Sequence, residues 1–189
     1  IITKIRLASL CIFYCTFMYF LLAKHIREGI LKGPSNHYLF LQKVLEHAQS
    51  SITIISPWIT NYVVDGNFID KVTKLINKDI TVKVMFGYNQ SVYNLDQLDK
   101  IASLDYKNID RRQTIDTLNN LYQVLGNQLT YRPPMHTKLL LIDQKYLVIG
   151  SYNWLSNNGI RKGAKDEISC IITDRRYINS INEYINKNI

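Results

Sequence analysis

Apolar and polar residues alternate along most of the chain in patterns that predict strands and helices in turn. Apolar residues at helical spacing predict four helices, over residues 36–49, 67–77, 92–125 (with a break near 105–108) and 175–186. Short runs rich in β-branched residues predict six strands, over residues 51–56, 80–88, 128–132, 138–143, 146–150 and 167–173. Strands that alternate with helices are typical of an α/β layered domain with a mostly covered sheet.

The N-terminal segment does not follow this pattern. Residues 7–23 form a run of 17 residues without a charge, LASLCIFYCTFMYFLLA, with basic residues on both sides. This is the short limit for a membrane-spanning helix, so a membrane segment, a helix buried in the domain or in a subunit interface, and a secretory signal all stay open. Gly33, Pro34 and Ser35 then predict the boundary between a hydrophobic segment, residues 1–35, and a domain over residues 36–189.

Length and composition define the class of protein further. The chain has 189 residues, of which 47% are hydrophobic and 20% charged. This composition excludes a disordered chain, a collagen and a small disulfide scaffold, and it predicts one globular domain with a full core. The three cysteines and four histidines have no CxxC or similar spacing, so no structural metal is expected.

The formal net charge of +8 is concentrated in two regions. Residues 1–34 contain five basic residues and one acidic residue, and residues 132–176 contain eight basic and four acidic residues. Between them, basic and acidic side chains cancel. A basic excess favours a polyanionic partner such as nucleic acid or an anionic membrane surface.

The second basic region begins with the stretch that carries the most chemistry, HTKLLLIDQKYLVIGSYN. His136 and Lys138 project to the same side of an extended strand because side chains alternate. The ammonium offsets the charge of a phosphodiester and the imidazole can form a bond to phosphorus. Gly150 permits close backbone approach, and Ser151 and Asn153 add neutral donors for phosphate oxygens.

This stretch matches HxKxxxxDxxxxxxGSxN, the signature of the phospholipase D superfamily, at all its fixed positions. The chain therefore resembles that superfamily, and in particular its nuclease-like branch with a single motif. The likeness extends to ITIISPWIT near residues 52–60 and to GSYNWLSNNG followed by DEIS. It implies a layered α/β/α fold in which helices flank a mixed central sheet.

The resemblance also implies a role for each motif residue. His136 is the expected nucleophile, which forms a covalent phosphohistidine that water hydrolyses without a metal or another cofactor. Lys138, Ser151 and Asn153 are expected to hold the phosphate, and Asp143 to support the site. Glu167 occupies the position of a carboxylate that bonds to the histidine imidazole and sets its tautomer.

Further substrate-binding residues are expected just after the motif. Trp154 is either a core residue or pocket wall, or an aromatic surface at the rim on which substrate stacks. Arg161, Lys162 and Lys165 follow on a loop that contains glycine, where contact with a phosphate backbone is favoured over a plain solubilising role.

The chain has one motif, whereas the superfamily's site needs two. The resemblance implies a homodimer with a twofold axis through the active site, in which one His136 attacks and its mate protonates the leaving oxygen. The leading hypothesis is a metal-independent endonuclease that cleaves DNA, or RNA.

Two other functions stay open. One is a membrane-associated phospholipase or cardiolipin hydrolase, which residues 7–23 favour, and the other is an inactive nucleic-acid-binding module of a longer protein. A cytoplasmic location is favoured, with membrane anchoring through residues 7–23 or export as alternatives.

Overall fold

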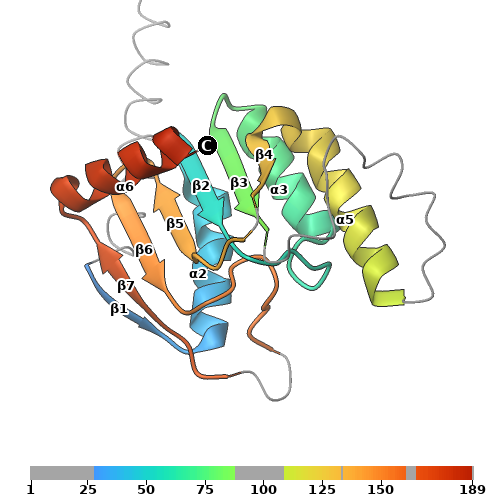
Figure 1. The fold of residues 1–189 in the computed structure, drawn as a ribbon, viewed down its shortest axis with the longest axis horizontal. Helices are drawn as coiled ribbons and strands as arrows, with labels where there is room; N and C mark the ends of the chain where they lie inside the picture. Colours follow the sequence, from blue (N-terminus) through green and yellow to red (C-terminus); the bar gives the residue numbers. More distant parts are fainter. Residues whose placement is uncertain (1–27, 88–108, 133, 161–164, 189) are drawn as a thin grey trace, which may run out of the picture.

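The computed structural model describes residues 28–87, 109–132, 134–160 and 165–188 (Figure 1). The strands are β1 (Gly29–Lys32), β2 (Ser51–Ile55), β3 (Thr81–Phe86), β4 (Leu129–Tyr131), β5 (Leu139–Ile142), β6 (Tyr146–Gly150) and β7 (Ile168–Ile172). The helices are α2 (Pro34–His47), α3 (Gly66–Ile76), α5 (Ile109–Leu125) and α6 (Arg175–Asn188), with the 3-10 helix η2 (Gly126–Gln128) before β4.

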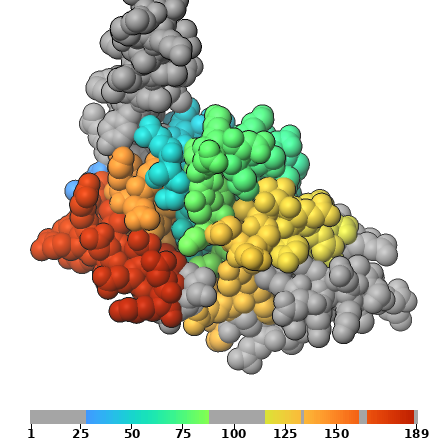
Figure 2. Space-filling model, turned by 90° about the horizontal axis from the view of Figure 1, so that it is seen from above, coloured from blue at the N-terminus to red at the C-terminus, as the bar shows by residue number. Residues whose placement is uncertain are grey.

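All the strands join one mixed sheet in the order β1-β7-β6-β5-β2-β3-β4. Strands β2, β3 and β4 run parallel, whereas β5 is antiparallel to β2 and the strands from β5 to β1 are antiparallel to one another. Helices α2, α3 and α5 contribute to the core on one face, and α6 packs on the other. Figure 2 shows the red surface of α6 on the opposite side from the green and yellow surfaces of α3 and α5. The predicted layered α/β/α fold with a mixed sheet is confirmed.

Burial explains why the middle of the sheet can be predicted from sequence. All four residues of β5 and four of the five residues of β2 are buried, because helices cover both faces of the sheet there. Helix α3 begins at its N-cap Asp65, whose carboxylate accepts a hydrogen bond from Phe68 N, and buries an apolar stripe of Phe68, Val72 and Leu75.

The sheet begins before the predicted boundary of the domain. Strand β1 pairs antiparallel with β7, and α2 begins at Pro34, so the boundary predicted after residue 35 falls within this helix. Three of the four residues of β1 are exposed, which leaves this edge strand without an alternating pattern. None of the helices that the structure describes is long and apolar enough to cross a membrane. Residues 7–23 and the predicted helical residues 92–108 lie outside the described part of the chain.

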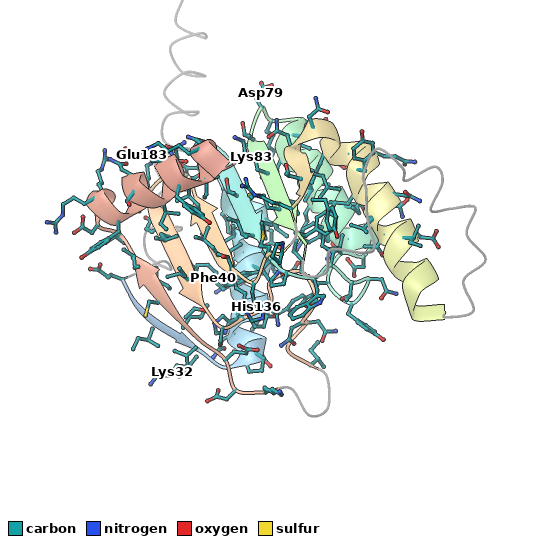
Figure 3. The ribbon with its side chains drawn as sticks, in the orientation of Figure 1. Lys32, Phe40, Asp79, Lys83, His136 and Glu183 are labelled. Atoms are coloured by element: carbon teal, nitrogen blue, oxygen red, sulfur yellow. The ribbon has the colours of Figure 1, made fainter. Side chains whose placement is uncertain are left out.

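One end of the sheet collects the residues of the motif. Because Ile55 pairs with Leu139, Leu139 with Ile149, and Gly150 with Ser169, strands β5 and β7 begin where β2 and β6 end. Strands β3 and β4 end on the same side because they run parallel to β2. We call this the motif end of the sheet. In Figure 3, His136 lies at this lower end, whereas Asp79, just before β3, lies at the opposite end.

Candidate active site

His136 and Lys138 meet in the extended segment that leads into β5. Lys138 Nζ lies 3.2 Å from His136 Nε2 and donates a hydrogen bond to the carbonyl oxygen of His136 at 2.9 Å. An ammonium can only donate, so in the neutral imidazole Nε2 carries the lone pair and Nδ1 the proton. The His136 ring is exposed, and the lone pair that can attack phosphorus is therefore the one beside the cation.

Lys138 itself is buried, with 8% of its surface exposed. Burial lowers the pKa of the Lys138 ammonium, and the negative charge of Glu167 acts in the opposite direction. The carboxylate therefore helps to keep a charged ammonium in a place where water does not solvate it well. A buried cation next to an exposed imidazole is suited to binding one phosphate group.

Ser151 and Glu167 are neighbours at the start of β7. The Ser151 hydroxyl donates a short hydrogen bond to Glu167 Oε2, and Ser151 N donates to the carbonyl oxygen of Ile168 at 3.0 Å. Ile168 N donates back to Ser151 Oγ at 3.1 Å. The carboxylate of Glu167 thus holds the hydroxyl at the motif end of the sheet, while its bond to the His136 imidazole stays a prediction.

Asn153 follows in a tight turn. Its carbonyl oxygen accepts hydrogen bonds from Ser156 N and Asn157 N, which fixes the backbone. Among the described residues, its buried side-chain oxygen has no hydrogen-bond partner. An unpaired buried amide oxygen costs about 1–3 kcal/mol, and this oxygen can accept a hydrogen bond from water.

Asp143 lies at the other end of β5, away from the motif end of the sheet. Its Oδ1 accepts hydrogen bonds from Gln49 N at 2.9 Å, Ser50 N at 2.8 Å and Ser51 N at 3.2 Å. These donors form the connection between α2 and β2. The structure therefore gives Asp143 a supporting role in the fold and does not place it at the motif end of the sheet with the other residues of the predicted catalytic set.

Replacing Asp143 by Ala is expected to lower the free energy of unfolding by about 2–4 kcal/mol, because three backbone N–H groups lose a charged acceptor. Asp143→Asn retains one acceptor oxygen and should lose less. Urea unfolding of both variants measures the effect, and kcat of the folded protein should stay close to that of the wild type. A large fall in kcat without a loss of stability would contradict this supporting role.

Of the two positions open to Trp154, the structure shows the one in the core and not the one at the rim of the site. It is fully buried, and its ring packs against Tyr152 at 5.0 Å, His37 at 5.5 Å and Phe40 at 6.3 Å between centroids. No face of this indole is open to a substrate. The half-buried Trp58 is the tryptophan beside His136, with its ring perpendicular to the imidazole at 5.8 Å between centroids.

The structure adds a second histidine behind the site. His37 is fully buried, with Nδ1 2.7 Å from the carbonyl oxygen of Gly33 and Nε2 2.9 Å from Ser169 Oγ. A carbonyl can only accept, so Nδ1 carries the proton and Ser169 donates to Nε2. Gly33 N in turn donates to the carbonyl oxygen of Glu167 at 2.8 Å. His37 thereby ties the start of α2 to the start of β7, where Glu167 holds Ser151.

Sequence reasoning missed His37, although a signal exists. His37, Leu41 and Val44 share one buried face of α2 at helical spacing, which places the imidazole in the core. Nothing in the sequence indicates that Ser169, far along the chain, is its partner.

The buried imidazole predicts a stability that falls in mild acid. Burial lowers the pKa of His37 below its ordinary value of 6.5, while the hydrogen bond to Gly33 and the charge of Glu167 raise it. In the unfolded chain His37 therefore binds a proton near pH 6.5, whereas in the folded protein it stays neutral until the pH is lower. Stability is fully present above this pH and is lost as the pH falls toward the lower pKa of the folded protein.

Urea unfolding at about pH 7.5 and about pH 5.5 tests this dependence, with an expected loss of about 1 kcal/mol per pH unit below the ordinary pKa. His37→Gln removes the titrating group and should unfold with a weaker pH dependence than the wild type. Equal slopes in the two proteins would show that other groups carry the effect.

The basic loop is described only in part. Lys165 is exposed and leads into the segment before Glu167, whereas Arg161 and Lys162 lie outside the described residues. Within the described part of the chain, no group of three or more His, Cys, Asp or Glu side chains is arranged to hold a metal ion.

A mixed sheet that carries a histidine, a buried lysine and a serine at one end defines a phospholipase D-like protein, a class whose members are phosphodiesterase-type enzymes. Residues 41–189 match the family described as "Cardiolipin synthase, PLD-like domain". The chain belongs to this family, and the predicted resemblance to the phospholipase D superfamily is confirmed. None of the curated proteins matches this sequence.

Solved structures share the fold at low sequence identity. NucT from Helicobacter pylori is 16% identical with a TM-score of 0.58, and the match covers 85% of this chain and 94% of NucT. The phospholipase D family member Nuc from Salmonella typhimurium is 13% identical with a TM-score of 0.56, and the match covers 85% of this chain and 93% of Nuc.

The archaeal chromatin protein TrmBL2 is described as having a novel mode of DNA binding. It is 13% identical with a TM-score of 0.50, and the match covers 98% of this chain and 63% of TrmBL2. At these identities the likeness to all three structures concerns the fold alone.

Proposed function

We propose that the protein is a metal-independent phosphodiesterase that cleaves nucleic acid, with DNA favoured over RNA, through a covalent phosphohistidine at His136. The observation that carries this proposal is the pair formed by His136 Nε2 and Lys138 Nζ, 3.2 Å apart. The nucleophilic lone pair and the cation that neutralises a phosphate lie side by side, and Ser151 and Glu167 lie at the same end of the sheet.

In the first step, a phosphate takes the place between the imidazole and the ammonium, and Nε2 attacks phosphorus while the bond to the leaving oxygen breaks. The leaving oxygen takes a proton from a general acid. Lys138 and the Asn153 amide N–H donate hydrogen bonds to the phosphate oxygens, whose charge increases in the transition state. The Ser151 hydroxyl has one proton, so it joins them by exchanging its hydrogen bond to Glu167 for one to the phosphate. In the second step, water attacks phosphorus, its proton passes to the group that had acted as acid, and the bond from phosphorus to nitrogen breaks.

The general acid of this scheme is the His136 of a second copy of the chain in a homodimer. Each chain carries a single motif, so a twofold axis through the site supplies the second imidazole. The two identical groups then differ only in protonation state. Light scattering tests the dimer, and a monomer with full activity would exclude this source of the acid.

Nucleic acid is favoured as the substrate because exposed cations, including Arg132 and Lys165, occur in the same region of the sequence as the motif. The fold is also shared with TrmBL2, a protein described by its DNA binding. A phospholipase or cardiolipin hydrolase is the second candidate, because the matching family is described as cardiolipin synthase and residues 7–23 are apolar.

The test is incubation of the full chain with supercoiled plasmid, single-stranded DNA, RNA and cardiolipin vesicles, each in EDTA. Cleavage of DNA that persists in the chelator is the expected result. Turnover of cardiolipin alone would replace the nuclease by the lipid hydrolase. DNA binding without any turnover would indicate the inactive binding module.

A further inference from the structure

We propose that Trp58 and Arg132 form a subsite for single-stranded nucleic acid beside His136, in which Trp58 stacks on a nucleobase and Arg132 contacts a neighbouring phosphate. This inference rests on the proposed function, because it assumes that a nucleic-acid phosphate lies at His136. It adds the part of the substrate that the motif does not recognise.

The position of Trp58 is set by the loop that follows β2. Ser56 Oγ donates to the carbonyl oxygen of Trp58 at 3.1 Å, and Leu155 N donates to Ser56 Oγ at 3.2 Å. Gly87 N, just after β3, donates to the carbonyl oxygen of Pro57 at 3.2 Å. The backbone of Trp58 is therefore held from two neighbouring segments, and a fixed aromatic ring loses little entropy when it binds a ligand.

The indole lies directly beside the imidazole of His136. Its ring centroid is 5.8 Å from that of the His136 imidazole, and the two planes are perpendicular, at 89°. The ring is half-buried, so part of it remains at the surface. Stacking on an aromatic side chain contributes about 1–3 kcal/mol per base for any of the bases, because each has a π-face.

Arg132 provides a cation farther along the same end of the sheet. It follows β4, where its backbone N–H donates to the carbonyl oxygen of Phe86 at 2.8 Å, and its side chain is exposed. Strands β2 and β3 separate β4 from β5, so three strand spacings, about 14 Å, lie between the ends of β4 and β5. A single phosphate at Lys138 cannot reach Arg132 over this distance, whereas a chain of phosphodiesters can.

Met135 lies at the end of β3, which is one of the intervening strands. Met135 N donates to the carbonyl oxygen of Gly87 at 2.6 Å, which holds the approach to His136 against the end of β3. Trp58, after β2, and Arg132, after β4, therefore lie on the same side of His136. In a duplex the bases are stacked on each other, so only a single strand can present a base to Trp58.

Tryptophan fluorescence gives a direct test, because the chain contains only Trp58 and the fully buried Trp154. The titrations use the full chain with His136→Ala, so that the ligand is not cut. The ligands are oligothymidylate, an abasic oligomer of the same length, a duplex and cardiolipin vesicles. We expect oligothymidylate to quench the emission and to bind about tenfold more tightly than the abasic oligomer.

Variants assign the two contacts. Trp58→Leu should remove the preference for oligothymidylate over the abasic oligomer. Arg132→Gln should weaken the binding of both oligomers equally and reduce its dependence on salt. Lys187→Gln is the matched control, because this exposed residue lies in the last turn of α6. The C-terminal end of α6 lies at the end of the sheet opposite the motif end (Figure 1), so the substitution should change nothing.

Equal affinity for the two oligomers, or a preference that survives Trp58→Leu, would overturn the subsite. Quenching that is stronger with the duplex or with vesicles than with the single strand would overturn it as well. Cleavage by the wild-type protein is measured separately. If the protein cleaves nucleic acid but binds the two oligomers equally, the subsite alone is refuted. If it prefers oligothymidylate through Trp58 but cleaves nothing, the phosphodiesterase is refuted and the subsite stays supported.

Discussion

Replacement of His136 by Ala is expected to lower kcat for phosphodiester hydrolysis by about 10⁴-fold or more, because the covalent route loses its nucleophile. The affinity for nucleic acid should change far less, because Lys138, Ser151 and Asn153 remain to bind the phosphate. Plasmid nicking in EDTA, followed over hours with excess protein, measures the residual rate. The same gels report binding through mobility shifts.

A control on the same chain is His47→Gln. His47 ends α2, next to the residues that bond to Asp143 at the end of the sheet opposite His136, and full activity is expected. Full activity in the His136 variant would place the nucleophile elsewhere.

The covalent intermediate gives the same prediction a second readout. Rapid acid-free denaturation of the wild-type protein during turnover of a ³²P-labelled substrate should leave label on the protein that is lost in acid, as expected of phosphohistidine.

Lys138→Gln should bind substrate more weakly and react about 10²–10³-fold more slowly, because the phosphate loses its only buried cation among the described residues of the motif.

The central sheet could be predicted from sequence because of its burial. Strands β2 and β5 are covered on both faces, so their residues form short apolar runs that stand out from helical spacing. The edge strand β1 has no such run, since three of its four residues face solvent, and only its pairing with β7 makes it a strand.

In the candidate site, too, some residues could be predicted from the sequence and others could not. The spacing of His136 and Lys138 along one extended segment is a local property, and it predicts that the two side chains project together. The positions of Trp58 and His37 depend on contacts between distant segments, with His136 in the segment before β5 in the first case and with Ser169 of β7 in the second. No local pattern distinguishes Trp58 beside His136 from Trp154 in the core.

Asp143 matches the motif but lies apart from the other motif residues. Its fixed spacing from His136 suggests that both residues serve the same site, but the four-residue strand β5 separates it from Lys138. A strand of this length spans about 13 Å, so the two ends of the motif lie at opposite ends of the sheet. The motif thus joins the residues proposed to bind phosphate to one that holds the connection between α2 and β2 at the other end of β5.

Gly150→Ala is expected to lower both stability and activity, because β7 passes directly over this residue. A Cβ atom at position 150 would lie closer than 3.0 Å to the carbonyl oxygen of Ile168 and to Cα of Ser169. These are backbone atoms of a paired strand, which cannot turn aside as a flexible side chain can. We expect the free energy of unfolding to fall by about 2–3 kcal/mol.

The loss of activity follows from the movement that relieves this clash. If β7 moves away from β6, Glu167 moves with it and releases the Ser151 hydroxyl, and a displacement of about 1 Å at a reacting group costs on the order of 10²-fold in rate. Measurement of kcat at a temperature where the variant is folded separates this effect from unfolding.

Gly66→Ala is the matched control for the Gly150 variant. An added Cβ at Gly66, the first residue of α3, meets nothing within 4 Å, so stability should stay within about 0.5 kcal/mol of the wild type and kcat should be unchanged. Ser169→Ala in the Gly150→Ala background removes one crowded hydroxyl but leaves the backbone contacts, and we expect little recovery. A Gly150→Ala protein with wild-type stability and kcat would show that β7 can move without carrying Glu167 away from Ser151, and that the close approach of the two strands is not required for catalysis.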